Sequence, residues 1–398
     1  MTKHLKDYLE AIGDDKDLFI HAIKDGHQVI DYILPCNKTF PEPEEFGIPT
    51  EERNKRLLRL DLRGIVFDMD GNLIRLPFNK FFNLGEREST TIENIDLSDP
   101  HYICEKLDGS LCAPFEVGCK LIFGSKFGET DFSKKMQEFA EKNNKYVLFS
   151  KAMIDIGCTP MFEYIGPGNR IVLDYKEENL VLLAIRKMST GDYLSYAQIK
   201  EYAGWFDIPL VKMYRGQKLT TEFVETLRKQ EGVEGVVVVF DDGLRVKIKA
   251  DHYVQLHKVK SMLSVEKEVV QLILDGKTDD LKPLLLKDDK DKLDAYETEL
   301  TTLINSQKNR VLSELAFIRD HKLIRKDFAL SIAQNLPKWI VTVIFLLWDY
   351  SGVESDIRYE IINQIKKNCI NNKKYDTMKE DGNLLNGLSN WTGGMFND

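Results

Sequence analysis

The sequence predicts an α+β fold in which an antiparallel-rich domain is followed by an all-helical domain. Up to about Leu256, short β-branched and aromatic runs alternate with Gly and Asp-Gly, a pattern typical of strands and turns. From about Ser264, glycines become rare and apolar residues recur at spacings of three and four, as they do on one face of a helix. We therefore expect a first domain over residues 1–262, a helical domain over 263–375 and a Gly- and Asn-rich, loosely held tail over 376–398.

The expected elements follow from these patterns in order along the chain. Strands are expected at residues 64–67, 102–104, 120–123, 170–173, 180–185 and 236–240. Helices are expected between them at 132–143 and 221–230, where apolar residues have helical spacing. The apolar run 339–348 predicts a core helix with Pro337 in its first turn.

Composition excludes several classes of protein. The 398 residues include 55 Lys and Arg against 64 Asp and Glu, so bulk positive charge does not hold this chain to nucleic acid or membrane. The run 339–348 is far shorter than the roughly 20 residues of a membrane-spanning helix. The N-terminus resembles no secretory signal, and the 6 cysteines form no CxxC pair. We expect a cytoplasmic protein with reduced thiols and no membrane partner.

A first motif has two interpretations. Asp68 and Asp70 lie in an Asp-x-Asp-Gly sequence after an apolar run, as in phosphatases of the haloacid dehalogenase type, where the first Asp attacks phosphorus. The same residues also suit a hairpin with its turn at Asp70 and Gly71. Asn72 stands where those phosphatases usually have Thr, and a similar Asp-Gly turn recurs within 240–244. We therefore favour the hairpin.

A Lys-x-Asp-Gly motif at Lys106 is the main indication of chemistry. Alone it is weak, because roughly one chain in ten of this length contains it by chance. Downstream come a carboxylate at Glu163 between aromatic residues, Glu234-Gly235 before a run of valines, and Lys247 and Lys249 on one face of a strand. Each feature alone is typical of a solvent-exposed strand face, but together and in this order they indicate one site.

The lysines of these motifs suit nucleotidyl transfer. An unprotonated amine must reach the α-phosphorus of a nucleoside triphosphate in line with departing pyrophosphate. Nearby cations at Lys247 and Lys249, with partial desolvation, would favour the neutral amine of Lys106. The same two ammonium groups can bind α-phosphate oxygens and stabilise the charge that develops during transfer.

The carboxylates and glycines of these motifs suit the rest of a nucleotide. Asp108, Glu163 and Glu234 can accept hydrogen bonds from ribose hydroxyls and hold the water shell of Mg²⁺. Gly109 and Gly235 would let the backbone approach the nucleotide closely.

These motifs resemble those of the covalent nucleotidyltransferase superfamily, which includes DNA ligases, RNA ligases and mRNA capping enzymes. They are most similar to the RNA ligase 1 family of the T-even bacteriophage type. The resemblance runs nearly end to end and weakens after about Lys322. The segments that carry it are 62–67, 79–84, 105–111, 125–126, 162–172, 190–193, 233–235 and 246–254.

The resemblance implies roles for individual residues. Lys106 would be the adenylylated nucleophile and Asp108 would complete its motif. The implied catalytic set is Lys106, Asp108, Glu163, Glu234, Lys247 and Lys249. The implied nucleotide-binding set is Tyr32, Arg63, Lys80, Glu105, Lys106, Lys126, Glu163, Lys247 and Lys249. The implied metal ligands are Glu234, Glu163 and Asp108. Leu107 departs from the phage sequence, which has an acidic residue there, but that position of the motif is variable.

The resemblance implies an ATP-dependent RNA ligase. Its cofactors would be ATP and Mg²⁺, with Mn²⁺ as an alternative, and its substrates RNA ends carrying a 5′-phosphate and a 3′-hydroxyl, such as a cleaved tRNA under repair. The helical domain would recognise RNA, and the protein would be a monomer. DNA ligases and capping enzymes carry a β-barrel after the lysine motifs, where this chain predicts helices. A DNA ligase, a guanylyltransferase and a non-catalytic RNA-binding relative remain as alternatives.

Overall fold

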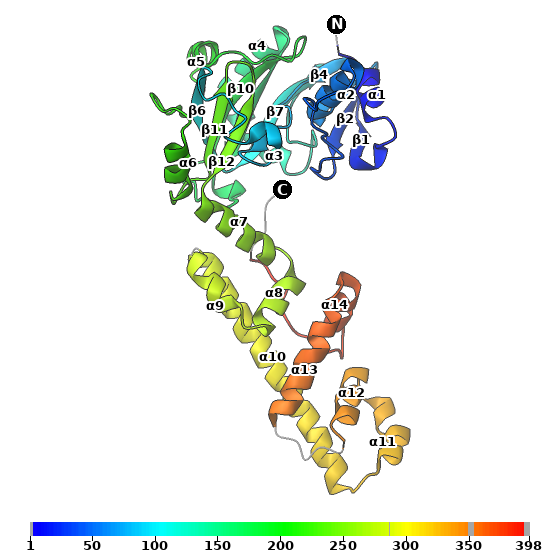
Figure 1. The fold of residues 1–398 in the computed structure, drawn as a ribbon. Coiled ribbons are helices and arrows are strands. Elements are labelled where there is room, and N and C mark those ends of the chain that lie inside the picture. The colour runs from blue at the N-terminus through cyan, green and yellow to red at the C-terminus, as the bar shows by residue number, and fades with distance from the viewer. Residues whose placement is uncertain (1–2, 286, 349–353, 394–398) are drawn as a thin grey trace. The chain divides into compact units, whose positions relative to one another are not determined.

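The computed structural model describes residues 3–285, 287–348 and 354–393. The chain divides into two compact units, Met1–Gln255 and Leu256–Phe396, each of which is described by itself. The first unit contains antiparallel sheets and helices, as the α+β prediction requires, and every regular element that the structure describes after residue 250 is helical (Figure 1). None of the helices in the described ranges combines the length and the apolar character that crossing a membrane requires.

The first sheet of unit 1 is an antiparallel meander in the order β1-β2-β3-β4, with two helices next to it. Its elements are α1 (Leu5–Ile12), β1 (Phe19–Lys24), β2 (His27–Tyr32), α2 (Thr50–Leu60), β3 (Arg63–Asp68) and β4 (Leu73–Arg75). Tyr8 of α1 packs against Phe67 of β3 in a core that also buries Ile30 and Ile65.

The turn between β3 and β4 confirms the predicted hairpin. Phe67 pairs with Leu73, and Gly71 has a φ of +87°. The Asp68 carboxylate accepts hydrogen bonds from the backbone N of Asn72 at 2.8 Å and from its Nδ2 at 2.9 Å. Asp68 therefore stabilises the turn, as expected for a short polar side chain that bonds to nearby backbone.

The second sheet is antiparallel, with strand order β10-β9-β7-β8, and packs against helices. Its strands are β7 (Ser110–Val117), β8 (Lys120–Gly124), β9 (Cys158–Ile165) and β10 (Asn179–Lys187). The helices of this part of the unit are α3 (Ser133–Lys142), α4 (Lys145–Asp155) and α5 (Tyr196–Trp205). Met136, Phe149 and Phe162 are fully buried between the sheet and α3 and α4.

The third sheet has the order β5-β12-β11-β6 and carries most of the predicted site. Its strands are β5 (Phe82–Asn83), β6 (His101–Lys106), β11 (Gly235–Phe240) and β12 (Arg245–Lys249), and α6 (Thr221–Arg228) packs nearby. β5 pairs with β12 in parallel, whereas β11 pairs with both neighbours antiparallel.

Most predicted elements of unit 1 are confirmed, but the strand predicted at 170–173 is wrong. That segment has no strand assignment. The backbone N–H groups of Val172 and Leu173 instead donate to the Asp108 carboxylate, at 2.7 Å and 2.6 Å. A side chain from a distant part of the chain thus takes the hydrogen bonds that a neighbouring strand would have taken.

The helical unit is organised around one long helix. Its helices are α7 (Asp251–Leu263), which begins in unit 1, α8 (Glu266–Leu274), α9 (Thr278–Leu281), α10 (Lys287–Asp320), α11 (Arg325–Ser331), α12 (Lys338–Leu346), α13 (Glu354–Asn368) and α14 (Asn372–Lys379). Along α10, Leu293, Leu300, Ile304 and Val311 are buried at the spacing of one helix face. This face and the isoleucines of α13 belong to one core, and α10 and α13 lie side by side (Figure 1). Pro337 is the N-cap of α12, and the predicted core helix there is confirmed.

The segment expected to be a loose tail packs into this core as far as the structure describes it. Leu384, Leu385, Leu388 and Trp391 are buried. The indole Nε1 of Trp391 donates a hydrogen bond to the backbone O of Leu263 at 2.5 Å. The Gly- and Asn-rich composition concealed these apolar residues, whose burial opposes the entropy of a free tail. Residues 394–398 lie outside the described residues.

Candidate active site

The register of the third sheet brings three predicted residues together. Gly235, the first residue of β11, pairs with Lys106 of β6 on one side and with Lys249 of β12 on the other. Glu234 directly precedes it, and its Oε1 lies 2.6 Å from the Nζ of Lys106 and 3.3 Å from the Nζ of Lys249. Glu234 is only 3% exposed, so its charge needs these partners.

The two predicted glycines serve the packing of strands. A Cβ on Gly235 would lie 2.0 Å from the backbone O of Ile248, and its φ is +149°. A Cβ on Gly109 would lie 2.4 Å from the backbone O of Tyr164. Both contacts are far too short for a real side chain. The expectation that these glycines admit a nucleotide is therefore corrected: each admits the backbone of a neighbouring strand.

Lys247 faces a group of positive charges. It lies two residues before Lys249 on β12, so both side chains share one face of the strand. Burial, together with the charges of Lys80, Arg63 and Lys106, lowers the pKa of Lys247 to about 7. At neutral pH, Lys247 is therefore only partly protonated in the free protein, and a bound phosphate would restore its charge.

Glu163 has the opposite shift. It lies on β9 opposite Leu111 of β7, just beyond the Lys-x-Asp-Gly turn. Burial raises the pKa of Glu163 to about 8, and the negative charges of Glu234 and Asp108 contribute, whereas Lys106 and Arg63 act against the shift. The Glu163 carboxyl is therefore mostly neutral at pH 7 and can donate a hydrogen bond as well as accept one.

Asp108 points into the protein and is fully engaged there. Its Oδ2 accepts the two N–H groups of Val172 and Leu173, and its Oδ1 accepts the Tyr253 hydroxyl at 2.7 Å. Asp108 is 1% exposed. It therefore fixes the turn that follows Lys106, the 172–173 segment and the start of α7, and its oxygens are not available to a ribose.

The predicted metal ligands do not form a joint site in this structure. Within the described ranges, no group of three or more His, Cys, Asp or Glu side chains is placed to hold a metal ion. The reason lies in the partners of two carboxylates. Asp108 bonds to backbone and to Tyr253, and Glu234 is paired with Lys106 and Lys249. The expected set of Glu234, Glu163 and Asp108 is corrected accordingly, since Asp108 has a structural role.

A second group of predicted residues lies around Tyr32, at the end of β2. The Nζ of Lys126 lies 3.6 Å from the centroid of the Tyr32 ring and 3.2 Å from the Oδ2 of Asp31. The Nζ of Lys80 lies 5.9 Å from the same ring. Asp31 pairs in register with Arg63 of β3. Tyr32, Arg63, Lys80 and Lys126 are thus brought together as a cation-rich group.

The ring of Phe81 connects this group with the third sheet. The Arg63 guanidinium lies 5.9 Å from its centroid, and the Nζ of Lys247 lies 5.3 Å from it. Burial lowers the pKa of Lys80 and raises that of Asp31 to about 6. The two groups therefore form one continuous positive region, in which positive charges meet without enough carboxylates to neutralise them.

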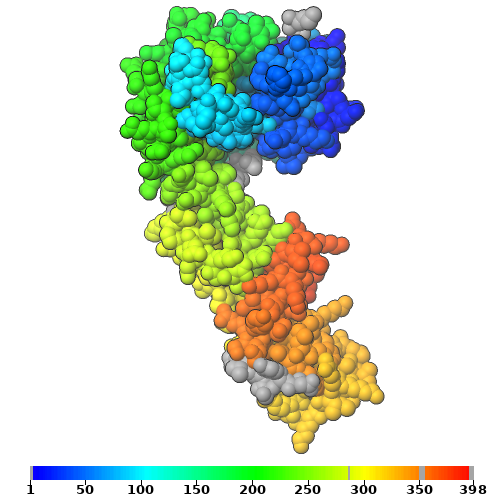
Figure 2. Space-filling view, viewed as in Figure 1, coloured from blue at the N-terminus to red at the C-terminus, as the bar shows by residue number. Residues whose placement is uncertain are grey.

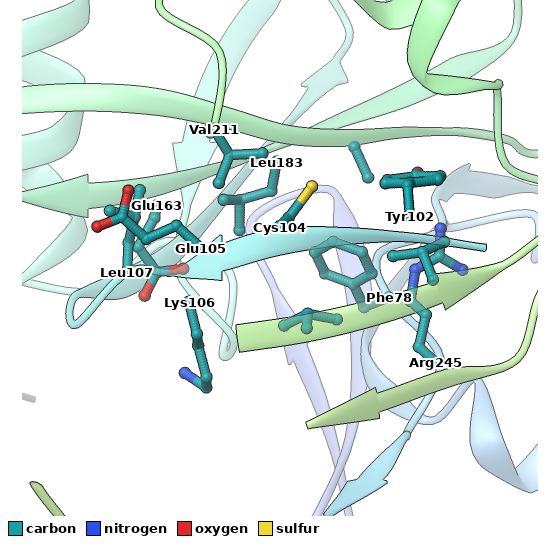
Figure 3. Close-up of a pocket in the computed structure, with 13 residues that line it drawn as sticks. Phe78, Tyr102, Cys104, Glu105, Lys106, Leu107, Glu163, Leu183, Val211 and Arg245 are labelled. Carbon is teal, nitrogen blue, oxygen red and sulfur yellow. The ribbon is translucent and has the colours of Figure 1, made fainter. Parts of the chain in front are cut away.

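An apolar pocket of about 550 Å³, open mouth included, lies between the second and third sheets (Figure 3). Glu105, Lys106 and Glu163 lie at one end of it, and Tyr102 and Arg245 at the other. The side chain of Lys106 points away from the apolar lining (Figure 3). The remaining lining residues are Phe78, Cys104, Leu107, Leu183, Ala184, Val211, Val237 and Val239. Such a slot suits a flat, largely apolar ring system.

The structure adds three residues that sequence reasoning missed. Asp31 pairs with Lys126, Tyr253 bonds to Asp108, and the buried guanidinium of Arg245 lies 3.4 Å from the ring centroid of Tyr193 at the far end of the pocket. The signals available in sequence were weak. Tyr253 lies in a segment that carried the family resemblance, and Asp31 is a lone carboxylate inside an otherwise strand-like run.

Comparison with protein families and curated proteins gives a consistent result. A family model described as RNA ligase matches residues 61–256. A putative RNA ligase of Thermovibrio ammonificans is 32% identical over 260 residues, which are 63% of this chain and 65% of that protein. RNA ligase 1 of bacteriophage TS2126 is 25% identical over 296 residues, 70% of this chain and 68% of that protein. The chain thus spans about two thirds of these relatives.

Solved structures show more distant likenesses. An archaeal ATP-dependent RNA ligase has 15% identity and a TM-score of 0.44, covering 65% of this chain and 64% of that one. A mutant of the Naegleria gruberi RNA ligase, solved with ATP and Mn, has 16% identity and a TM-score of 0.34, covering 40% of this chain and 52% of that one.

Proposed function

We propose that this chain is an ATP-dependent RNA ligase with Lys106 as its nucleophile, because residues 61–256 match a family model described as RNA ligase and the similar curated proteins are RNA ligases. The ligase would join a 5′-phosphate RNA end to a 3′-hydroxyl RNA end. The observation that carries the assignment of Lys106 is its pairing with Glu234, which it shares with Lys249 across three adjacent strands. This pairing places the Lys106 amine next to a second ammonium group that suits phosphate binding.

The first reaction is transfer of AMP to Lys106. The Lys106 ammonium loses its proton to solvent, and the resulting amine attacks the α-phosphorus of ATP. An N–P bond forms, and the bond from the α-phosphorus to pyrophosphate breaks. Lys247 and Lys249 bind the α-phosphate oxygens, and the positive region around Tyr32 binds the outgoing phosphates. In the free protein, Glu234 forms an ion pair with Lys106. This ion pair must break before the amine can attack.

The apolar pocket beside Lys106 is the proposed adenosine site. The base would enter between the sheets, with the ribose at the end where Glu105 and Glu163 lie. A largely neutral Glu163 can donate to or accept from a ribose hydroxyl without bringing a buried negative charge close to the phosphates. The choice of adenine over guanine follows from the family.

A divalent metal ion would be held here by the carboxylate of Glu234, with Asp108 excluded by its internal bonds and Glu163 assigned to the ribose. Mg²⁺, or Mn²⁺ in its place, would neutralise phosphate charge and orient the leaving pyrophosphate when bound.

Two further transfers would complete ligation. The 5′-phosphate of an RNA end attacks the AMP phosphorus, and the N–P bond to Lys106 breaks. The 3′-hydroxyl of a second end then attacks the activated 5′-phosphate, which forms a phosphodiester and releases AMP. Arg63, Lys80 and Lys126 supply positive charge for the RNA phosphate in these steps. A tRNA cut during damage is a substrate of the right chemistry, and the helical unit is the part proposed to recognise RNA.

Intact mass after mixing the protein with ATP and Mg²⁺ tests the first step. We expect a mass increase of one AMP in the wild-type protein and in Lys151→Ala, whose lysine is exposed on α4 and is not among the residues assigned to the site. Lys106→Ala should show no increase. Parallel samples with GTP, and then with nicked DNA or 5′-phosphorylated RNA, separate the capping and DNA ligase alternatives. An adduct that persists in Lys106→Ala would overturn the assignment.

A further inference from the structure

The helical unit contains a second pocket, built mainly from cations and amides. It holds about 1000 Å³, open mouth included, between α12, α13, α14 and the segment after α14. These helices lie next to one another along one side of the helical unit, orange to red in Figure 2. The lining residues are Lys338, Trp339, Gln364, Asn368, Asn371, Lys373, Lys374, Thr377, Met378, Asn383 and Leu384.

The charge of this lining is unusual for the chain. Three lysines line the pocket, and no Asp or Glu is among the described residues that do so, although the whole chain has a net charge of −9. Lys338, Lys373 and Lys374 are exposed, and none of their ammonium groups has an ion-pair or hydrogen-bond partner among the described residues. Elsewhere in this unit, lysines such as Lys282 and Lys379 bond to carboxylates.

The positions of these lysines are unfavourable for the helices themselves. Lys338 begins α12, and Lys373 and Lys374 lie in the first turn of α14. Positive side chains near a helix N-terminus oppose the helix dipole, whereas acidic ones complement it. Helix stability therefore gives no reason for cations here, and attraction of an anion does.

The rest of the lining can bind a base. Trp339 lines the pocket and is held in place by a hydrogen bond from its Nε1 to the backbone O of Gly382 at 3.3 Å. Gln364 has no side-chain hydrogen bond within the described ranges, so its donor and acceptor are both available. An aromatic ring with nearby amides and cations is the combination that binds an unpaired nucleotide, through stacking, base-edge hydrogen bonds and phosphate contacts.

We propose that this pocket binds a nucleotide of single-stranded RNA, with Lys373 and Lys374 on its phosphates and Trp339 against a base. The inference rests on the RNA substrate proposed above, and it gives that substrate a contact outside the strand-built unit. The shared chemistry is a phosphorylated nucleoside, so a free nucleotide is the other possible source of the ligand.

Fluorescence anisotropy with the full-length protein and labelled single-stranded RNA of about 16 nucleotides tests the proposal. We expect Lys373→Glu/Lys374→Glu to bind RNA at least about tenfold more weakly. The slope of log K against log salt concentration should become less steep by about 1.4, because two contacts to single-strand phosphates are lost. The matched control is Lys290→Glu/Lys292→Glu on α10. It makes the same change in net charge at two exposed lysines outside the pocket, and should change affinity by less than about twofold.

A second variant tests stacking. Trp339→Leu keeps an apolar side chain against the core and removes the aromatic face, so RNA binding should weaken about fivefold or more. Equal effects of the pocket variant and its control would overturn the proposal. So would weaker binding of AMP or ATP to the pocket variant with unchanged RNA affinity, since that outcome assigns the pocket to free nucleotides.

The same wild-type protein is assayed for the AMP adduct. If the wild-type protein forms no adduct but the pocket variant binds RNA more weakly, the pocket proposal stands and the ligase proposal is wrong. If the wild-type protein forms the adduct but the pocket variant binds RNA as tightly as wild type, the ligase proposal stands and the pocket proposal is wrong. Failures of the two proposals are thus distinguishable.

Discussion

The two basic regions of this protein hold their cations in different ways. Around Lys106 the cations are buried or half-buried, and several are held by carboxylates or lose charge on burial: Lys106 and Lys249 share Glu234, Lys126 pairs with Asp31, and burial lowers the pKa of Lys247 to about 7. In the helical pocket the lysines are exposed and have no partner among the described residues. Cations that take part in chemistry must be positioned and controlled, whereas cations that attract a phosphate need only remain charged.

Breaking the shared carboxylate should have the largest effect. Glu234→Gln keeps the size of the side chain but removes the charge that holds Lys106 and Lys249. We expect the rate of AMP transfer to fall by about 100-fold or more, because the change removes the carboxylate that positions both lysines and that would hold the divalent metal ion. Single-turnover adduct formation measures this rate. A fall of less than about threefold would show that the pairing has no part in catalysis.

Removing the charge of Asp108 should have the next largest effect, and mainly on stability. Asp108→Asn keeps one acceptor oxygen for three donors, so we expect a loss of about 2 to 4 kcal/mol in the free energy of unfolding. Urea denaturation measures it, with Asp155→Asn at an exposed position as the control. An unchanged free energy would argue against the structural role of Asp108.

The raised pKa of the buried Glu163 carboxyl can be tested through the pH dependence of stability. Its folded-state pKa of about 8 lies above the ordinary value of 4.5, so the folded protein holds this proton more tightly than the unfolded chain. The contribution of Glu163 to stability is therefore present at low pH and is lost as the pH rises from about 4.5 to 8. Glu163→Gln, which mimics the neutral acid, should gain roughly 1 to 3 kcal/mol relative to wild type between pH 5 and pH 8.

The measurement is urea denaturation of both proteins at the two pH values. Glu116→Gln on β7 serves as the control and should show no such gain. A difference between wild type and Glu163→Gln that does not change with pH would mean that Glu163 is ionised in the folded protein.

The helical pocket should give the smallest effect on stability. Because Lys373 and Lys374 are exposed and lie in a first helical turn, Lys373→Glu/Lys374→Glu should change the free energy of unfolding by no more than about 0.5 kcal/mol, in the stabilising direction. The same denaturation assay measures it. A large loss of stability would remove the contrast between the two regions, because it would show that these lysines also support the fold.

Sequence patterns predicted the parts of the site that depend on local order. The alternation of Lys247 and Lys249, and the position of Glu234 before a valine-rich strand, follow from strand geometry. The partners of Asp108 could not be predicted, because Tyr253 lies 145 residues away in sequence and the 172–173 segment has a strand-like composition. The neighbours of Gly109 and Gly235 are also distant in sequence. The sequence therefore suggested that these glycines face a nucleotide, whereas they face the backbone of neighbouring strands.

The single oxygen that Lys106 shares with Lys249 has a consequence for the resting protein. An amine held as an ammonium ion is a poor nucleophile toward any electrophile, including acyl phosphates and aldehydes of the cell. If Lys106 is the nucleophile as proposed, its ion pair with Glu234 would also protect this amine from accidental modification until a nucleotide binds.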